Sequence, residues 1–465
     1  MKCLILNTGV VGLLTAVSIR RQYGPNVSVR IVDTYSPEEQ SIIRLGPETL
    51  NFIVRELGFS LTDLMRGPNP GIFYLGLQVK PGGMAETSII THAPTRAQIG
   101  AMPVNYAVER LRRVGGMEKL EQYSLAARMI KANVMVLPNK KGECPLGEDE
   151  IGITISADHL RNLLMSQLLK DGVSLAPMKV AELHSENECI RVVFSDGSAE
   201  TFDFIISTDA NFEIFTRVQC SRSIQWASTD SLSNPCTTIV FDANGWQFTE
   251  SVSGKKRKEI RCIGEADEEF KAAHCDNDEI KTKTSAWFGA TWKNRIVFLS
   301  EYNFWGAEFL LDPLQPIVKV VALLTNLVPM HADADLLARY FNERTEEVGI
   351  ACRQYVVACL MESPVKHREQ VISEYDMATY SARKSVYLST GQPMQAPANL
   401  IGEGSWAAFW HAFSVYPYNI SSLLQSLDLE EVVRQLSDID LNIAEIVPRL
   451  PSHKYYISLI NGGEA

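Results

Sequence analysis

Residues 2–33 read KCLILNTGVVGLLTAVSIRRQYGPNVSVRIVD and contain an apolar segment, a glycine turn, a helical segment and a second apolar segment. Residues 2–6 are typical of a short buried strand, and residues 13–22 favour a helix. Residues 27–33 favour a second strand that ends in an acid. A strand, a tight turn, a helix and a strand in this order predict a parallel βαβ unit. We therefore expect an α/β protein built on a parallel sheet.

The turn after the first strand carries a variant of the G-x-G-x-x-G dinucleotide fingerprint. Asn7 takes the place of the first glycine, whereas Gly9 and Gly12 are kept. Asn tolerates left-handed backbone angles, and the glycines let a pyrophosphate approach a helix N-terminus. An acid follows about 20 residues later, where a ribose hydroxyl is bound. The residues expected to contact a dinucleotide are Asn7, Gly9, Val10, Val11, Gly12 and Asp33. The alternative is a structural βαβ turn.

A second segment favours FAD over NAD. Residues 201–210 form an apolar strand that ends in Asp209 and Ala210, and they follow the hairpin signal Asp196-Gly197. This order resembles the later FAD-contacting strand of flavin monooxygenases, with Ala210 in place of a glycine. Asp209 is therefore added to the expected cofactor contacts.

The composition indicates a folded, acidic protein with two modules. The chain has 465 residues and a formal charge of −11, which disfavours nucleic acid and anionic membranes as partners. Residues 317–330, the longest apolar stretch, are too short to span a bilayer, and no secretory signal precedes the first strand. The nine cysteines are scattered without a C-x-x-C pair, so neither disulfides nor a metal site are indicated. We expect a cytoplasmic protein, and we interpret the basic cluster at residues 255–258 as a solvated loop.

The remaining pattern divides the chain into a β-containing part and a mostly helical part. Further strands are expected at residues 180–183, 190–194, 201–207, 237–241 and 296–299, and helices at 48–57, 159–169, 317–327, 333–363 and 420–436. We expect an FAD-binding module over residues 1–315, with a β-rich, substrate-facing segment at about 70–130 and 210–295. Residues 316–465 are expected to form a helical substrate cap.

Five segments of the chain resemble the flavin-dependent tryptophan halogenase family. They are the glycine-rich opening at residues 7–16, Gly46-Pro47-Glu48-Thr49 with the helix after it, residues 72–76, residues 245–249 and residues 309–315. The resemblance implies an FAD-binding, Rossmann-like flavin monooxygenase/halogenase fold with a mostly helical C-terminal cap. It also implies that Gly46, Thr49 and Trp246 lie at the cofactor.

The resemblance implies that this chain halogenates an aromatic substrate by the reaction of that family. Reduced FAD, supplied by a separate flavin reductase, and dioxygen convert chloride, bromide or iodide to hypohalous acid. A lysine then passes the electrophile to a small aromatic substrate. The altered substrate side of this chain implies a substrate other than free tryptophan. The oligomeric state is left open and includes a homo-oligomer.

Several of the family's catalytic positions are changed here. Tyr74 stands where the family has its lysine, and Lys80, six residues later, is an alternative catalytic residue. On one strand both would face the same side, about 20 Å apart. Gln315 replaces the glutamate that contacts the substrate amine. The halide-binding amides align with Pro316, Ile317 and Val318; because proline has no N–H, only Ile317 and Val318 are candidates.

Aromatic residues suggest a substrate pocket. Phe248 replaces the family's second tryptophan, and Trp246 keeps the first. His92, Phe248, Trp406 and Trp410 are therefore candidate substrate contacts. The spacing of the C-terminal aromatics equally fits an amphipathic helix buried in a core.

Three functional classes follow from these observations. The first is a halogenase. The second is a flavin monooxygenase that hydroxylates its aromatic substrate directly, because the loss of the second tryptophan weakens the wall between flavin and substrate. The third is a catalytically degenerate flavin-binding homologue, which the changes at Asn7, Tyr74 and Pro316 favour.

Overall fold

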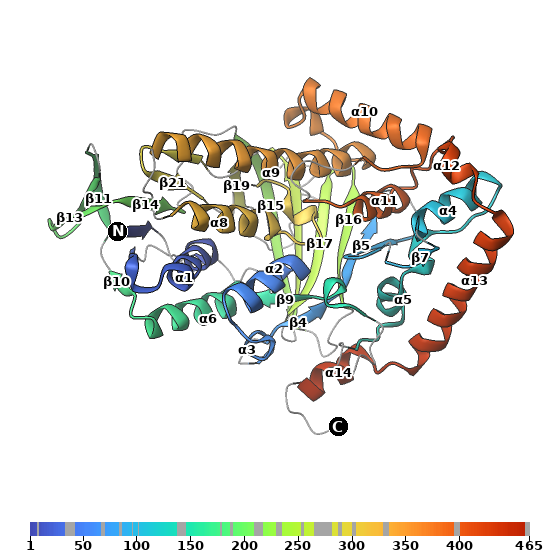
Figure 1. Ribbon diagram of the computed structural model, residues 1–465, viewed down its shortest axis with the longest axis horizontal. Helices are drawn as coiled ribbons and strands as arrows, with labels where there is room; N and C mark the ends of the chain where they lie inside the picture. Colours follow the sequence, from blue (N-terminus) through green and yellow to red (C-terminus); the bar gives the residue numbers. More distant parts are fainter. Residues whose placement is uncertain are drawn as a thin grey trace.

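The structure is a computed structural model (Figure 1). It describes residues 1–6, 9–32, 42–66, 70–82, 86–94, 96–100, 102–136, 146–176, 179–186, 189–208, 217–228, 235–252, 255–264, 281–286, 291–299, 304–328, 334–394 and 400–460. Three expected cofactor contacts, Asn7, Asp33 and Asp209, lie outside these residues.

A six-stranded sheet carries the predicted βαβ unit. Its order is β10 (Ser174–Ala176), β2 (Ser28–Val32), β1 (Lys2–Leu6), β14 (Phe204–Ser207), β21 (Ile296–Phe298) and β20 (Thr291–Lys293). All neighbours are parallel except β20 and β21. The strand, helix and strand expected over residues 2–33 are thus confirmed, with β1 at the centre of the sheet.

Helices pack beside this sheet and against one another. Helix α1 (Val10–Tyr23) contacts α6 (Ala157–Lys170) and α8 (Gln315–Leu327). Ser18 of α1 lies 3.0 Å from the Thr325 hydroxyl of α8, and the Tyr23 hydroxyl donates to the Thr325 carbonyl at 2.7 Å. Helix α8 is therefore tied to the βαβ unit at the start of the chain.

A second, seven-stranded sheet forms the middle of the molecule. Its order is β19 (Lys281–Ala286), β15 (Arg217–Ser228), β18 (Lys255–Ile263), β17 (Gly245–Val252), β16 (Cys236–Asp242), β5 (Gly76–Lys80) and β6 (Ser88–Thr91). The interpretation of residues 255–258 as a loop is wrong, because they begin β18 and pair with both β15 and β17. Opposite charges on the neighbouring strands compensate part of this cluster.

Smaller sheets complete the strand inventory. One has the order β3 (Ile42–Leu45), β9 (Gly152–Ser156) and β4 (Ile72–Tyr74), and another pairs β7 (Gln98–Ile99) with β8 (Met102–Pro103). A third has the order β11 (Val180–Ser185), β12 (Ile190–Phe194) and β13 (Ala199–Phe202). The Asp196-Gly197 hairpin between β12 and β13 is confirmed, with Gly197 at φ +83°. The segment expected as one helix over residues 48–57 is α2 (Pro47–Asn51) followed by the π-helix η2 (Phe52–Glu56), ahead of α3 (Leu61–Met65).

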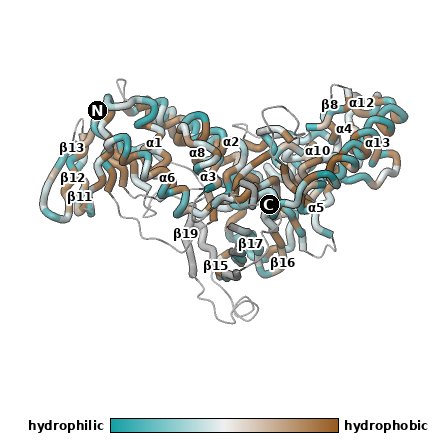
Figure 2. The backbone as a smooth tube through the Cα atoms, turned by 90° about the horizontal axis from the view of Figure 1, so that it is seen from below, coloured by the Kyte–Doolittle hydropathy of each residue, from teal (hydrophilic) through white to brown (hydrophobic). Residues whose placement is uncertain are grey.

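The end of the molecule opposite the N-terminus is helical (Figure 2). We call this part the helical cap. It contains α4 (Val104–Arg113), η3 (Leu120–Tyr123), α5 (Leu125–Ala132), α10 (Glu374–Thr390), α11 (Glu403–Ala412), α12 (Ser422–Gln425), α13 (Leu429–Ile446), α14 (His453–Ile460) and the C-terminal end of α9 (Ala334–Glu362). Helix α9 also packs on α8 and β20, and so connects the cap to the six-stranded sheet. Residues 104–132 were expected within a β-rich segment, yet α4 and η3 pack on α13. The division of the chain at residue 315 stays a prediction. Within the described residues, no helix is both long and apolar enough to cross a membrane.

Candidate functional site

The N-terminus of α1 is suited to an anion. Gly9 precedes the helix in an extended conformation, and Leu13 donates its amide to the Gly9 carbonyl at 3.1 Å. No side chain caps this end, and no acidic residue lies in the first turn. The first amides of a helix have no intrahelical acceptor, and the helix dipole favours negative charge there. The turn that Gly9, Val10, Val11 and Gly12 form therefore fits a pyrophosphate.

Gly46 and Thr49 pack against Asp312, a residue that the sequence did not single out. The Thr49 amide and hydroxyl donate to the Asp312 carboxylate at 3.0 and 2.8 Å. A Cβ on Gly46 would lie 2.5 Å from Asp312 Cβ, so only glycine allows this approach. Burial raises the pKa of Asp312 to about 6, although the bonds from Thr49 lower it. Because the Thr49 hydroxyl is committed to Asp312, it holds α2 to the segment before α8.

Gln315 lies at the start of α8 and contacts α2. Its amide nitrogen donates to Glu48 at 2.5 Å, and Lys319 lies 3.4 Å from the same carboxylate. The Val318 amide donates to the Leu314 carbonyl at 2.9 Å, which commits it to the helix. The side chains of Ile317 and Val318 are buried. The Ile317 amide makes no such backbone hydrogen bond among the described residues, so it is the remaining candidate for a halide contact.

Tyr74 is fully buried and bound to an arginine. Nη1 of Arg44 donates to the Tyr74 hydroxyl at 3.3 Å and to the Leu310 carbonyl at 3.2 Å, and Nη2 donates to the Glu308 carbonyl. Burial raises the pKa of Tyr74. The His92 ring meets the Tyr74 ring edge-on at 5.2 Å, and burial together with Arg44 lowers the pKa of His92 to about 3. Tyr74 and His92 are therefore both neutral at physiological pH.

Arg44 belongs to a ring of alternating charges between β3, β17, β18 and η6 (Ala307–Phe309), in which the last contact, from Glu308 back to Arg44, runs through the Glu308 backbone carbonyl and not through its carboxylate. The six residues are Arg44, Glu250, Arg257, Glu259, Arg261 and Glu308, and we call them the charge ring. Arg44 lies 3.1 Å from Glu250, which lies 3.4 Å from Arg257. Arg257 pairs with Glu259, Glu259 lies 2.8 Å from Arg261, and Arg261 lies 2.5 Å from Glu308.

The charge ring was missed because its members are far apart in sequence. The detectable signal was the alternation of Arg257, Glu259 and Arg261, which places the three side chains on one face of a strand. Arg44 and Glu250 are only 3% and 7% exposed, so their charges compensate each other away from water.

Lys80 is not on the same strand as Tyr74. Strand β4 ends at Tyr74 and belongs to the three-stranded sheet, whereas β5 begins at Gly76 and belongs to the seven-stranded sheet. Lys80 pairs in register with Val240 of β16. Within the described part of the chain, its ammonium makes no hydrogen bond or ion pair. The prediction that both residues share one face of one strand is wrong.

Trp246 and Phe248 lie side by side with other aromatics on the middle sheet. Trp246 is fully buried, with its ring centroid 5.2 Å from Phe309 and 6.3 Å from Trp305. Phe248 lies 6.0 Å from Phe309. Phe309 thus connects both sequence-predicted positions.

Trp406 and Trp410 lie inside the helical cap, on α11. The Tyr355 ring lies 5.4 Å from Trp406, and Tyr387 stacks on Trp410 at 5.4 Å. Trp406 and Trp410 are both fully buried, as expected for a helix packed in a core. Their role as substrate contacts stays a prediction.

Unpaired polar atoms mark the space around these aromatics. The indole nitrogens of Trp246, Trp406 and Trp410, and Nε2 of His92, are buried without a hydrogen-bond partner among the described residues. Buried polar atoms in native proteins are nearly always paired with protein, water or ligand.

No protein-family model matches the chain, and no curated protein is similar to it in sequence. Solved structures are similar along the whole length. BrvH, a flavin-dependent halogenase from Brevundimonas sp. BAL3, is 16% identical with a TM-score of 0.81, covering 99% of each chain. Xcc4156, a flavin-dependent halogenase from Xanthomonas campestris, is 13% identical with a TM-score of 0.83, covering 100% of this chain and 99% of that one. Tar14, a tryptophan C-6 flavin-dependent halogenase from taromycin biosynthesis, is 13% identical with a TM-score of 0.80, covering 99% of each chain. The chain therefore has the fold of the flavin-dependent halogenases.

Proposed function

We propose that this chain is a flavin-dependent halogenase. It uses reduced FAD from a separate reductase, dioxygen and a halide to halogenate an aromatic substrate other than free tryptophan. The observation that carries the proposal is the match to halogenase structures over 99–100% of the chain. Fold alone does not define a reaction, so the residues of the site have to support it.

The α1 turn is the proposed FAD-binding element. Its first turn, which contains no acidic residue, fits the diphosphate, and bound reduced FAD would supply the electrons that activate dioxygen. Gly46 and Thr49, fixed by Asp312, would hold the adjacent α2 in place. Trp246, buried beside Phe309, would separate the flavin from the substrate.

Tyr74 is the proposed donor at the position of the family's lysine. Its hydroxyl oxygen accepts from Arg44, and no acceptor for its own proton appears among the described residues. The hydroxyl can therefore donate a hydrogen bond to hypohalous acid, with the Arg44 charge behind it. Gln315 is an amide that already binds Glu48, so we assign it orientation rather than proton transfer. Lys80, whose ammonium has no protein partner in the described ranges, remains the alternative carrier.

The aromatic interior of the cap is the proposed substrate pocket. His92 contacts Tyr74, and Trp406 contacts Tyr355 and Trp410, whereas Phe248 contacts Phe309. Faces of aromatic rings suit an aromatic ligand, and the unpaired indole N–H groups suit its polar atoms. The Ile317 amide is the proposed halide contact.

Incubation with a flavin reductase, FAD, dioxygen and a panel of phenols, indoles and pyrroles tests the proposal. Chloride, bromide and iodide are supplied in separate reactions, and the products are analysed by mass spectrometry. A halide-dependent mass increase is expected. Absence of halogenated product with every halide would refute halogenation.

Phe248 in place of the second tryptophan favours one competing function, direct hydroxylation. The same experiment separates the two, because a monooxygenase adds one oxygen whatever the halide. Titration with FAD tests the degenerate homologue, which would bind the cofactor only weakly.

A further inference from the structure

A buried carboxylate in the helical cap has one oxygen without a partner. Glu109 lies on α4 and is 2% exposed. Its Oε1 accepts from the Tyr387 hydroxyl of α10 at 2.5 Å, and Nε2 of His411 on α11 lies 2.8 Å from the same oxygen. Its Oε2 is buried and has no hydrogen-bond partner among the described residues. Three helices of the cap therefore converge on a carboxylate that is satisfied on one side only.

The partners of Glu109 define which kind of group is missing. A carboxylate only accepts hydrogen bonds, so Nε2 of His411 must carry the proton in this contact. Nδ1 of His411 is also buried and unpaired in the part of the chain that the structure describes. The open Oε2 of Glu109 requires an occupant that donates hydrogen bonds.

The charge around Glu109 favours a cation. Tyr387 stays protonated because burial and Glu109 raise its pKa. Arg112, one turn further along α4, acts electrostatically on Tyr387. Its guanidinium, however, donates to the Glu118 carbonyl at 2.8 Å and lies over the Tyr416 ring at 3.4 Å. Among the described residues, Arg112 makes no hydrogen bond or ion pair with the carboxylate, so an incoming ammonium would meet an open negative charge.

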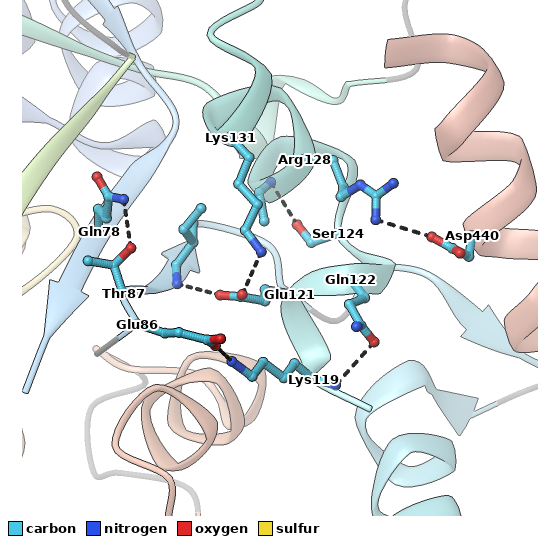
Figure 3. A network of polar contacts seen from close by, with 12 residues as sticks. Gln78, Glu86, Thr87, Lys119, Glu121, Gln122, Ser124, Arg128, Lys131 and Asp440 are labelled. Atoms are coloured by element: carbon cyan, nitrogen blue, oxygen red, sulfur yellow. Dashed lines mark hydrogen bonds and ion pairs between the residues drawn. The ribbon is translucent and has the colours of Figure 1, made fainter. Parts of the chain in front are cut away.

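Glu121 shows how a structural carboxylate in the same cap is satisfied. It accepts from the Ile89 amide at 2.6 Å on one oxygen and from Lys131 at 2.7 Å on the other (Figure 3). Both oxygens of Glu121 thus have protein donors. The open oxygen of Glu109 is therefore not a general property of acids in this cap.

The position next to the aromatic pocket indicates what the occupant belongs to. Tyr387 stacks on Trp410, whose indole nitrogen is also unpaired. His411 also lines a small hollow of about 10 Å³ with Ser88, Thr91 and Ser124, which Glu109 reaches only through its contact with His411. We propose that Glu109, positioned by Tyr387 and His411, binds an amine or ammonium group of the aromatic substrate. This inference rests on the proposed function, since it assigns the polar end of that substrate.

Binding of three indoles without flavin or halide tests the assignment. The probes are tryptamine with an ammonium group, 3-methylindole without a polar tail, and indole-3-propionate with a carboxylate. Calorimetry should show tryptamine bound at least about tenfold more tightly than the other two, as expected for one charge-assisted hydrogen bond. Glu109→Gln should abolish this preference and leave 3-methylindole affinity unchanged.

Glu362→Gln is the matched control, because Glu362 is a cap carboxylate that already pairs with Lys384 at 2.5 Å. It should keep the tryptamine preference. An equal preference in wild type and Glu109→Gln, or no preference in wild type, overturns the proposal.

A wild-type crystal soaked with tryptamine gives a second readout that does not depend on a folded variant. The amine should lie within hydrogen-bond distance of Glu109 Oε2, and a water there with tryptamine bound elsewhere or not at all refutes the site. The measurement needs no turnover, so a failed halogenation assay with intact amine binding contradicts only the proposed reaction.

Discussion

Removal of Arg44 should destabilise the protein strongly, because this guanidinium is the link that closes the charge ring. Arg44→Met would leave Glu250, 7% exposed, with Arg257 at 3.4 Å as its remaining cation. It would also remove the donors from the Glu308 and Leu310 carbonyls. Loss of one partner from a buried pair costs about 3–5 kcal/mol, so we expect a decrease of that size in the free energy of unfolding.

A double-mutant cycle separates the ion pair from the packing of its side chains. Arg44→Met with Glu250→Leu removes both charges and keeps apolar volume. Its cost should be lower than the sum of the two single substitutions by about 2 kcal/mol. Urea unfolding followed by circular dichroism measures the three variants. Additive costs, or a single Arg44→Met cost below about 1 kcal/mol, would show that the two groups do not interact across a buried contact.

Three further predictions concern the site. Tyr74→Phe should lower the halogenation rate by about tenfold or more with little change in melting temperature, whereas Lys80→Ala should retain activity; the reverse pattern would assign the role to Lys80. Because burial raises the pKa of Asp312 from 3.8 to about 6, its contribution to stability is present below pH 3.8 and is lost as pH rises through 6, by up to about 3 kcal/mol. Asp312→Asn should flatten this part of the stability–pH curve, and an unchanged curve would contradict it. Gly9→Asp should cap α1 without loss of melting temperature yet weaken FAD affinity by about tenfold or more, since the new carboxylate opposes the phosphates; unchanged affinity by fluorescence titration would exclude the α1 turn.

The fold was largely predictable from local sequence patterns. The βαβ order of residues 2–33, the hairpin at Asp196-Gly197 and the helices after Pro316 depend on apolar periodicity and turn residues close together in the chain. The basic residues 255–258 misled the interpretation, because charge alone suggests solvent. Their strand is compatible with charge since Glu250 and Glu259 neutralise Arg257.

The site was less predictable, because its geometry depends on residues from distant segments. Nothing local reveals that Arg44 reaches Tyr74, or that Asp312 binds Thr49. The break between Tyr74 and Gly76, which puts Lys80 in another sheet, is likewise set by pairing with β9 and β16 rather than by the intervening Leu75. The resemblance to a family motif predicted that Tyr74 takes the place of the lysine, but it did not show which residues surround Tyr74.

The surroundings of Tyr74 explain why this position holds no lysine. An ammonium placed where the Tyr74 hydroxyl lies would be 3.3 Å from the Arg44 guanidinium. Two unit charges at that separation repel by about 5 kcal/mol at an effective dielectric constant of about 20. Arg44 cannot move away cheaply, since Glu250 and two backbone carbonyls hold it. A buried arginine at position 44 therefore requires a neutral side chain at position 74. In this chain the positive charge is carried by Arg44, which lies behind the Tyr74 hydroxyl.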